Sequence, residues 1–109
     1  ENIESFLIQI ENRGFKNILL YGAGEVCEIL LNAIKSSKVV NIKAQAIIDD
    51  NLEKVGNKIG STSIISRELI GSYEHDGILI SSYTNNESIY NRLMQVGYSK
   101  DKIIQFFSL

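Results

Sequence analysis

A short apolar run leads directly into two closely spaced glycines and then into a helical pattern, in Asn17-Ile-Leu-Leu-Tyr-Gly22-Ala-Gly24-Glu-Val-Cys27. Gly22 allows the strand to turn sharply, and Gly24, which has no Cβ, lets a phosphate approach the main chain. The helix that follows points unpaired N–H groups and the positive end of its dipole at the same place. We therefore expect the main-chain amides around Ala23 to be free and to receive an anion such as a nucleotide diphosphate.

The motif reads Gly-x-Gly-x-x-Cys, so Cys27 stands where a third glycine is usual. A cysteine is only a little larger than the alanine that this pattern tolerates. We predict cofactor contacts from the whole loop, namely Gly22, Ala23, Gly24, Glu25 and Val26. Two interpretations of Glu25 stay open, because its charge suits the helix dipole but repels a phosphate: an exposed helix-start residue, or a hydrogen-bond partner of a sugar hydroxyl.

A second apolar run, Ile42 to Ile48, ends on Asp49 and Asp50, and Asp49 follows Gly24 by 25 residues. That spacing is close to the roughly 20 residues at which an acid holds the ribose of a dinucleotide. We predict that Asp49 and Asp50 bind the cofactor and that their charge favours NAD over NADP. The alternative is a polar turn that ends a strand. Glu53, Lys54 and Lys58 are mixed in sign, and we expect them to face solvent.

The length of 109 residues, with 44% hydrophobic residues, fits one domain over residues 1–109. The chain is small for an enzyme that binds two substrates, and it starts at Glu1, so we expect a fragment of a longer protein whose other domains are its partners. No acid, base and nucleophile combine into a catalytic set, and Cys27 has no histidine near it in sequence. We therefore assign no catalytic residue.

Eleven basic and thirteen acidic residues give a formal charge of −2, without a basic stripe. This charge argues against nucleic acid as a partner. The apolar runs are too short to span a membrane and the first residues do not form a signal peptide, so we expect a cytoplasmic protein. With one cysteine and one histidine we expect neither an internal disulfide nor a metal site.

Strand patterns alternate with helical patterns along the chain, which predicts an α/β fold with a parallel sheet covered on both faces. Expected strands are 17–21, 42–48, 62–65, 77–83 and 102–107, and expected helices are 3–10, 24–36, 66–70 and one from about 85 to Gly97. The five strands in the order 3-2-1-4-5 would bring Ser81, Ser82, Tyr83 and Thr84 opposite Gly22 to Glu25. We predict Ser81, Tyr83 and Thr84 as cofactor contacts. The leading helix could dock on this domain, connect to another, or form a homodimer contact.

Three segments carry a resemblance to a known family: Tyr21-Gly-Ala-Gly-Glu-Val, Ile47-Ile-Asp-Asp-Asn-Leu-Glu-Lys-Val-Gly-Asn-Lys-Ile59 and Gly97-Tyr-Ser-Lys-Asp-Lys-Ile-Ile104. Together they resemble the Rossmann-like nucleotide-binding domains of bacterial polysaccharide-biosynthesis proteins. Such domains precede the catalytic domain of nucleotide-sugar dehydratases and epimerases, or the β-helix of sugar acetyltransferases. The resemblance implies a three-layer α/β/α fold, with Gly22 to Glu25 as the nucleotide loop and Asp49 and Asp50 as the acids after the second strand.

Two hypotheses follow for function. The first is a module that binds NAD or a nucleotide sugar, with coenzyme A as a further ligand, and is not catalytic alone. The second is a scaffold or interaction domain that has kept the fold and lost the ligand. Cys27 and Glu25 favour the second, because both depart from what a phosphate loop needs.

Overall fold

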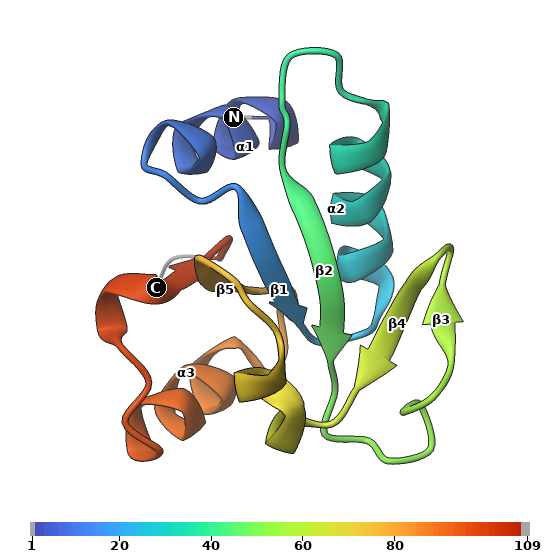
Figure 1. Ribbon diagram of the computed structural model, residues 1–109, viewed down its shortest axis with the longest axis vertical. Helices are drawn as coiled ribbons and strands as arrows, with labels where there is room; N and C mark the ends of the chain where they lie inside the picture. Colours follow the sequence, from blue (N-terminus) through green and yellow to red (C-terminus); the bar gives the residue numbers. More distant parts are fainter. Residues whose placement is uncertain (1, 108–109) are drawn as a thin grey trace.

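One sheet of six strands, in the order β3-β4-β2-β1-β5-β6, organises the computed structural model, which describes residues 2–107 (Figure 1). The elements are α1 (Ile3–Asn12), β1 (Asn17–Tyr21), α2 (Glu25–Ser36), β2 (Lys43–Ile48), β3 (Lys58–Ile59), β4 (Thr62–Ile65), the 3₁₀ helix η1 (Arg67–Ser72), β5 (Gly77–Ile80), α3 (Asn86–Gln95), the 3₁₀ helix η2 (Lys100–Lys102) and β6 (Ile103–Gln105). Strand β1 is central and pairs in parallel with both neighbours, so that Leu20 lies between Ile47 of β2 and Leu79 of β5.

The expected sheet is correct for its parallel part and wrong in its strand count. The parallel strands run β4-β2-β1-β5-β6, which is the predicted order 3-2-1-4-5. The sixth strand, β3, pairs antiparallel with β4 at the edge and lies between the expected strands 42–48 and 62–65, where no strand was predicted. Gly60 has a φ of +61° between the two strands, and a glycine with this geometry closes a tight hairpin. Strands β5 and β6 are also shorter than the expected ranges 77–83 and 102–107.

Helices cover both faces of the sheet and give three layers (Figure 1). Side chains alternate along β1: Ile18 and Leu20 pack with α1 and α2, whereas Leu19 and Tyr21 pack with α3 on the opposite face. All four are buried. The leading helix α1 docks on this domain through Leu7 and Ile10. Of the helices in residues 2–107, none combines the length and apolar character needed to cross a membrane.

The side chain of Asp76 fixes the sheet at the amino ends of its strands. Asp76, just before β5, accepts hydrogen bonds from the N–H groups of Lys16 at 2.9 Å and Asn17 at 2.8 Å. These two bonds lower the pKa of the Asp76 carboxyl, Asn17 contributing more. Asp76 therefore joins the start of β1 to the start of β5. Because the two strands are paired along their length, this also fixes where their carboxyl ends and the loops that follow them lie.

We expect Gly77→Ala to destabilise the fold by about 1–3 kcal/mol, since added core atoms force neighbours to shift. A Cβ at Gly77 would lie 2.6 Å from Phe15 Cε1 and 2.7 Å from the carbonyl oxygen of Lys102. Urea unfolding measures the change. Gly71→Ala is the matched control, because a Cβ there meets nothing within 4 Å. Equal stability of the two variants would contradict this packing.

Candidate functional site

The glycine loop turns away from the sheet at Gly22, directly after β1. Gly22 has a φ of +119°, and a Cβ there would lie 3.0 Å from Ser82 Cβ and 3.3 Å from the backbone of Ser81. The Gly22 N–H donates to the Ile48 carbonyl oxygen at 2.8 Å, and the Ser81 hydroxyl donates to the Gly22 carbonyl oxygen at 2.8 Å. Glycine is thus required both by backbone conformation and by close approach, and the loop is held between β2 and β5.

Helix α2 begins at the loop with Gly24 as its N-cap and has no side-chain cap. Within residues 2–107, no acceptor is present for the N–H groups of Gly24, Glu25 and Val26. These donors and the helix dipole favour an anion at this point. Glu25 is exposed in the first helical turn.

The N–H of Ala23 is not free, which corrects the expectation that all the amides around it would be. It donates to Asp49 Oδ2 at 2.7 Å, while Asp49 Oδ1 accepts from the Asn51 N–H at 2.8 Å. The sequence could not show this bond, because it joins residues that are 26 positions apart. The acid after β2 therefore holds the glycine loop in shape.

Lys54 also reaches this loop, which corrects the expectation that it faces solvent. Its Nζ donates to the Ala23 carbonyl oxygen at 3.0 Å, and the side chain is half-buried. Sequence reasoning missed Lys54 because the polar turn that carries it has charges of both signs.

A cleft of about 310 Å³ opens between the glycine loop and the end of β5. It is lined by Gly22, Ala23, Gly24, Glu25, Val26, Asp49, Lys54, Ser81, Ser82, Tyr83, Thr84 and Asn85. All of the residues predicted from the sequence as cofactor contacts lie here except Asp50. Tyr83 is 70% exposed, and its ring stands edge-on to Phe107 with the centroids 5.0 Å apart. The cleft thus combines backbone donors, one lysine and an exposed aromatic ring.

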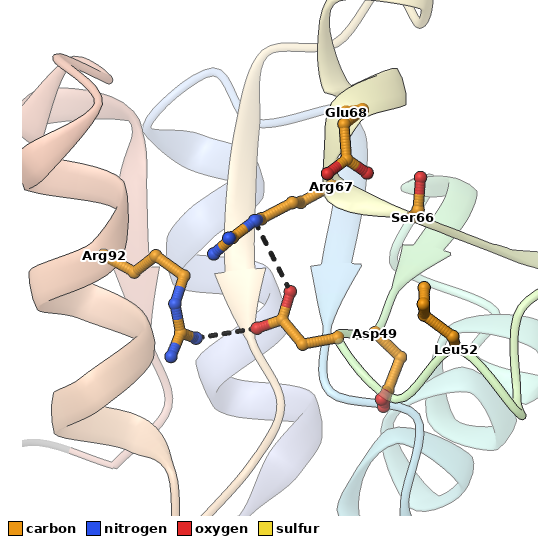
Figure 2. Close-up of a pocket in the computed structure, with 7 residues that line it drawn as sticks. Asp49, Leu52, Ser66, Arg67, Glu68 and Arg92 are labelled. Carbon is orange, nitrogen blue, oxygen red and sulfur yellow. Dashed lines mark hydrogen bonds and ion pairs between the residues drawn. The ribbon is translucent and has the colours of Figure 1, made fainter.

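Asp50 points to the other side of β1, toward α3. The Tyr21 hydroxyl lies 2.9 Å from both Asp50 carboxylate oxygens, and Arg92 Nη1 donates to Asp50 Oδ2 at 2.7 Å. Arg67 Nε lies 3.9 Å from Asp50 Oδ1. Burial, and then the hydrogen bond with Asp50, raises the pKa of Tyr21, which keeps this hydroxyl protonated as a donor. In Figure 2, dashed lines join both Arg67 and Arg92 to one carboxylate, which is that of Asp50.

Cys27 is fully buried beneath the loop, and burial raises the pKa of its thiol to about 12. The thiolate is the reactive form of cysteine. Across the part of the chain that the structure describes, no three His, Cys, Asp or Glu side chains are grouped so that they could hold a metal ion.

A protein-family model described as C2185-like, N-terminal, matches residues 14–104. No curated protein sequence matches the chain. UDP-D-quinovosamine 4-dehydrogenase from Vibrio fischeri is similar in structure, with a TM-score of 0.66 and 20% identity over 88% of this chain and 81% of that one.

RSP, a Rex-family repressor, has a TM-score of 0.64 and 17% identity over 94% of this chain and 56% of RSP. RSP in complex with β-NAD⁺ and operator DNA gives a TM-score of 0.61 at 18% identity, over 94% of this chain and 54% of RSP. The chain thus spans a little over half of the repressor. At these identities the likeness shows a shared Rossmann-like fold, and it gives no support to a sugar acetyltransferase.

We expect Asp49→Ala to destabilise the protein by about 1–3 kcal/mol, because two hydrogen bonds to a charged group are lost and the N–H groups of Ala23 and Asn51 lose their partner. Glu53→Ala, which removes the same charge from an exposed side chain in the following turn, is the control. Chemical denaturation of both variants measures the difference. A stability loss no larger than that of the control would show that Asp49 does not hold the loop.

We expect the Cys27 thiol to resist modification in the folded protein. With a pKa of about 12, the thiolate fraction at pH 8 is on the order of one in ten thousand, against a substantial fraction for an ordinary free thiol. Reaction with a chromogenic disulfide reagent, with and without urea, tests this. Rapid stoichiometric labelling without urea would contradict the burial of Cys27.

Proposed function

Because the chain belongs to the family of C2185-like N-terminal domains, we propose that it is a nucleotide-binding module of a larger protein. Its glycine-loop cleft binds NAD or a nucleotide sugar, and the module does not catalyse a reaction alone. The parent protein acts in polysaccharide biosynthesis or a related modification of sugars. Two similar structures support this proposal, since one is named for a UDP-sugar substrate and the other was obtained with β-NAD⁺.

The observation that carries the proposal is the uncapped start of α2, which opens into the cleft. The N–H groups of Gly24, Glu25 and Val26 have no acceptor among residues 2–107, and Lys54 supplies a cation in the same lining. A diphosphate accepts from such donors and offsets the lysine's charge.

Asp49 retains the capacity to bind a ribose while it holds Ala23. Each of its oxygens accepts one backbone N–H, and a carboxylate oxygen has two lone pairs. One acceptor position on each oxygen is left for a ribose hydroxyl. Asp49 on its own therefore still favours NAD over NADP, because a 2′-phosphate would lose that bond and be repelled.

A ligand-free scaffold is the second candidate function. The bond from the Ala23 N–H to Asp49 favours it, since one donor of the loop is already used by the protein itself. Glu25 also places a negative charge at the helix start.

DNA binding, which the repressor's complex exhibits, does not form part of the proposal for this chain. DNA binding depends on lysines and arginines gathered on one face. The eleven basic residues here are outnumbered by thirteen acidic ones.

Gly24→Ala is the sharpest test of the proposal. A Cβ at Gly24 meets nothing within 4 Å and the backbone there is extended, so we expect the variant to fold, with a loss of about 0.5–1 kcal/mol because alanine is a poorer N-cap than glycine. The added methyl group occupies the space through which a diphosphate approaches the backbone. We therefore expect the wild type to bind NAD or UDP-glucose and Gly24→Ala to lose at least about tenfold in affinity, which is about 1.4 kcal/mol.

Thermal-shift assays and calorimetry with NAD, NADP, coenzyme A and UDP-glucose provide the readout. A ligand at one hundred times its Kd stabilises the folded state by about 2.7 kcal/mol. Gly71→Ala, remote from the cleft and equally open around its Cβ, is the control. The scaffold hypothesis is favoured if the wild type shows no shift with any of these ligands.

A further inference from the structure

A second cavity, of about 280 Å³, lies at the ends of β2 and β4 beside the glycine-loop cleft (Figure 2). It is lined by Asp49, Asp50, Leu52, Ser66, Arg67, Glu68 and Arg92. We propose that Arg67 and Arg92 form a subsite for an oxyanion, either a phosphate monoester or a carboxylate, at the far end of the bound nucleotide. This inference rests on the proposed function for the identity of the rest of the ligand. The binding of an oxyanion by the two arginines does not depend on it.

Asp50 itself is faced by more positive than negative charge, although the cavity lining as a whole carries three carboxylates, those of Asp49, Asp50 and Glu68, against two guanidinium groups. Two guanidinium groups, those of Arg67 and Arg92, face this one carboxylate, at 3.9 Å and 2.7 Å. A guanidinium carries five N–H donors. Among the residues that the structure describes, Arg92 Nη1 donates to Asp50 and the guanidinium of Arg92 also interacts with the Tyr21 hydroxyl, whereas Arg67 meets Asp50 as an ion pair at 3.9 Å. Most of these donors are therefore available to a planar or tetrahedral oxyanion, which arginine binds through paired hydrogen bonds.

The other two carboxylates of the cavity already have hydrogen-bond partners. Asp49 accepts from the N–H groups of Ala23 and Asn51. Glu68 is fully exposed, and its hydrogen bond with Ser66 lowers the pKa of its carboxyl. Solvent screens a charge in that position. Neither carboxylate is paired with an arginine by an ion pair within residues 2–107.

Arg92 is held by its hydrogen bond to Asp50, and Arg67 approaches the same carboxylate at ion-pair distance. They come from different elements, since Arg67 begins η1 and Arg92 lies on α3, and Figure 2 shows both reaching toward the same carboxylate. That carboxylate is fixed from beneath by the hydroxyl of Tyr21, which is buried in the sheet. The donors of Arg92, which are already positioned on Asp50, lower the ordering cost of binding.

The arginine cavity and the glycine-loop cleft adjoin each other, and a third cavity shares lining residues with both. This third cavity, of about 270 Å³, shares Gly22 and Asn85 with the cleft and shares Asp50 and Arg92 with the arginine cavity. Asp49 borders all three. A ligand longer than a mononucleotide can thus run along the carboxyl ends of the strands, with its diphosphate at the loop and its oxyanion between the arginines.

The first experiment tests the subsite without any nucleotide. Inorganic phosphate is titrated into isotopically labelled protein at constant ionic strength, and NMR follows the Nε–Hε signals of Arg67 and Arg92. We expect both signals to shift with saturation, and we expect Arg67→Ala to weaken the effect on Arg92 at least about fivefold, since one of two arginine donors is lost. No shift at either arginine, or a shift equal to that produced by chloride, would overturn the subsite whatever the cleft binds.

The second experiment uses pairs of nucleotides that differ by one oxyanion: NADP against NAD, and UDP-glucuronate against UDP-glucose. In each pair, one nucleotide carries the extra oxyanion: NADP in the first pair and UDP-glucuronate in the second. We expect Arg67→Ala to lower the affinity for that nucleotide about tenfold relative to the other, which is the scale of a lost charged contact. A change confined to the first pair identifies a phosphate, and a change confined to the second identifies a carboxylate. Unchanged ratios in both pairs would overturn the proposal. Failure of all four nucleotides to bind would instead contradict the proposed function, and the phosphate titration would then decide the subsite alone.

Two further variants separate a subsite from a structural ion pair. Arg67→Lys keeps the positive charge but lacks the planar guanidinium with its paired N–H donors. We expect it to recover part of the oxyanion affinity that Arg67→Ala loses. Lys38→Ala removes an exposed charge from the loop between α2 and β2, and it should leave the ratios within about twofold. Thermal unfolding of each variant verifies that it is folded.

Discussion

The parallel pairing of β1 with both β2 and β5 is the constraint on which the site depends. It brings the ends of three strands to one edge, so that Gly22 meets Ser81 and Ser82 directly after β5 and is bonded to Ile48 of β2. The positive φ of Gly22 then directs the chain into α2 with its first N–H groups facing the cleft. A side chain at this one position would displace the loop and the start of the helix together.

The two acids after β2 show how neighbouring residues acquire different roles. Consecutive side chains at the end of a strand point to opposite faces of the sheet. Asp49 therefore turns to the α2 side and holds Ala23, whereas Asp50 turns to the α3 side, where Tyr21 and Arg92 bind it. Asp49 holds the glycine loop, and Asp50 pairs with two arginines. The end of β2 therefore contributes side chains to two adjacent cavities.

Reasoning from the sequence recovered the features that depend on local pattern. The strand, the glycines and the helix around Gly22 follow from periodicity and from the lack of a Cβ, and the parallel pairing follows from the alternation of strands and helices. The strand order 3-2-1-4-5 came from the arrangement usual for open α/β sheets. The hairpin strand β3 was missed because two residues are too few to show a period. Lys54, Arg67 and Arg92 were missed because each is an isolated charge in a polar or helical segment, and only long-range pairing shows what it faces.

The sequence by itself determined that a strand turns at glycines into a helix and that acids follow the next strand, because these are properties of backbone sterics and short-range order. Only the tertiary structure decided that the Ala23 N–H is bonded to Asp49, that Lys54 reaches the loop, and that two arginines share Asp50. The physical reason is that hydrogen bonds and charge pairing depend on distances of a few ångströms between residues far apart in the chain. Those distances are set by strand register and helix packing, which no local pattern encodes.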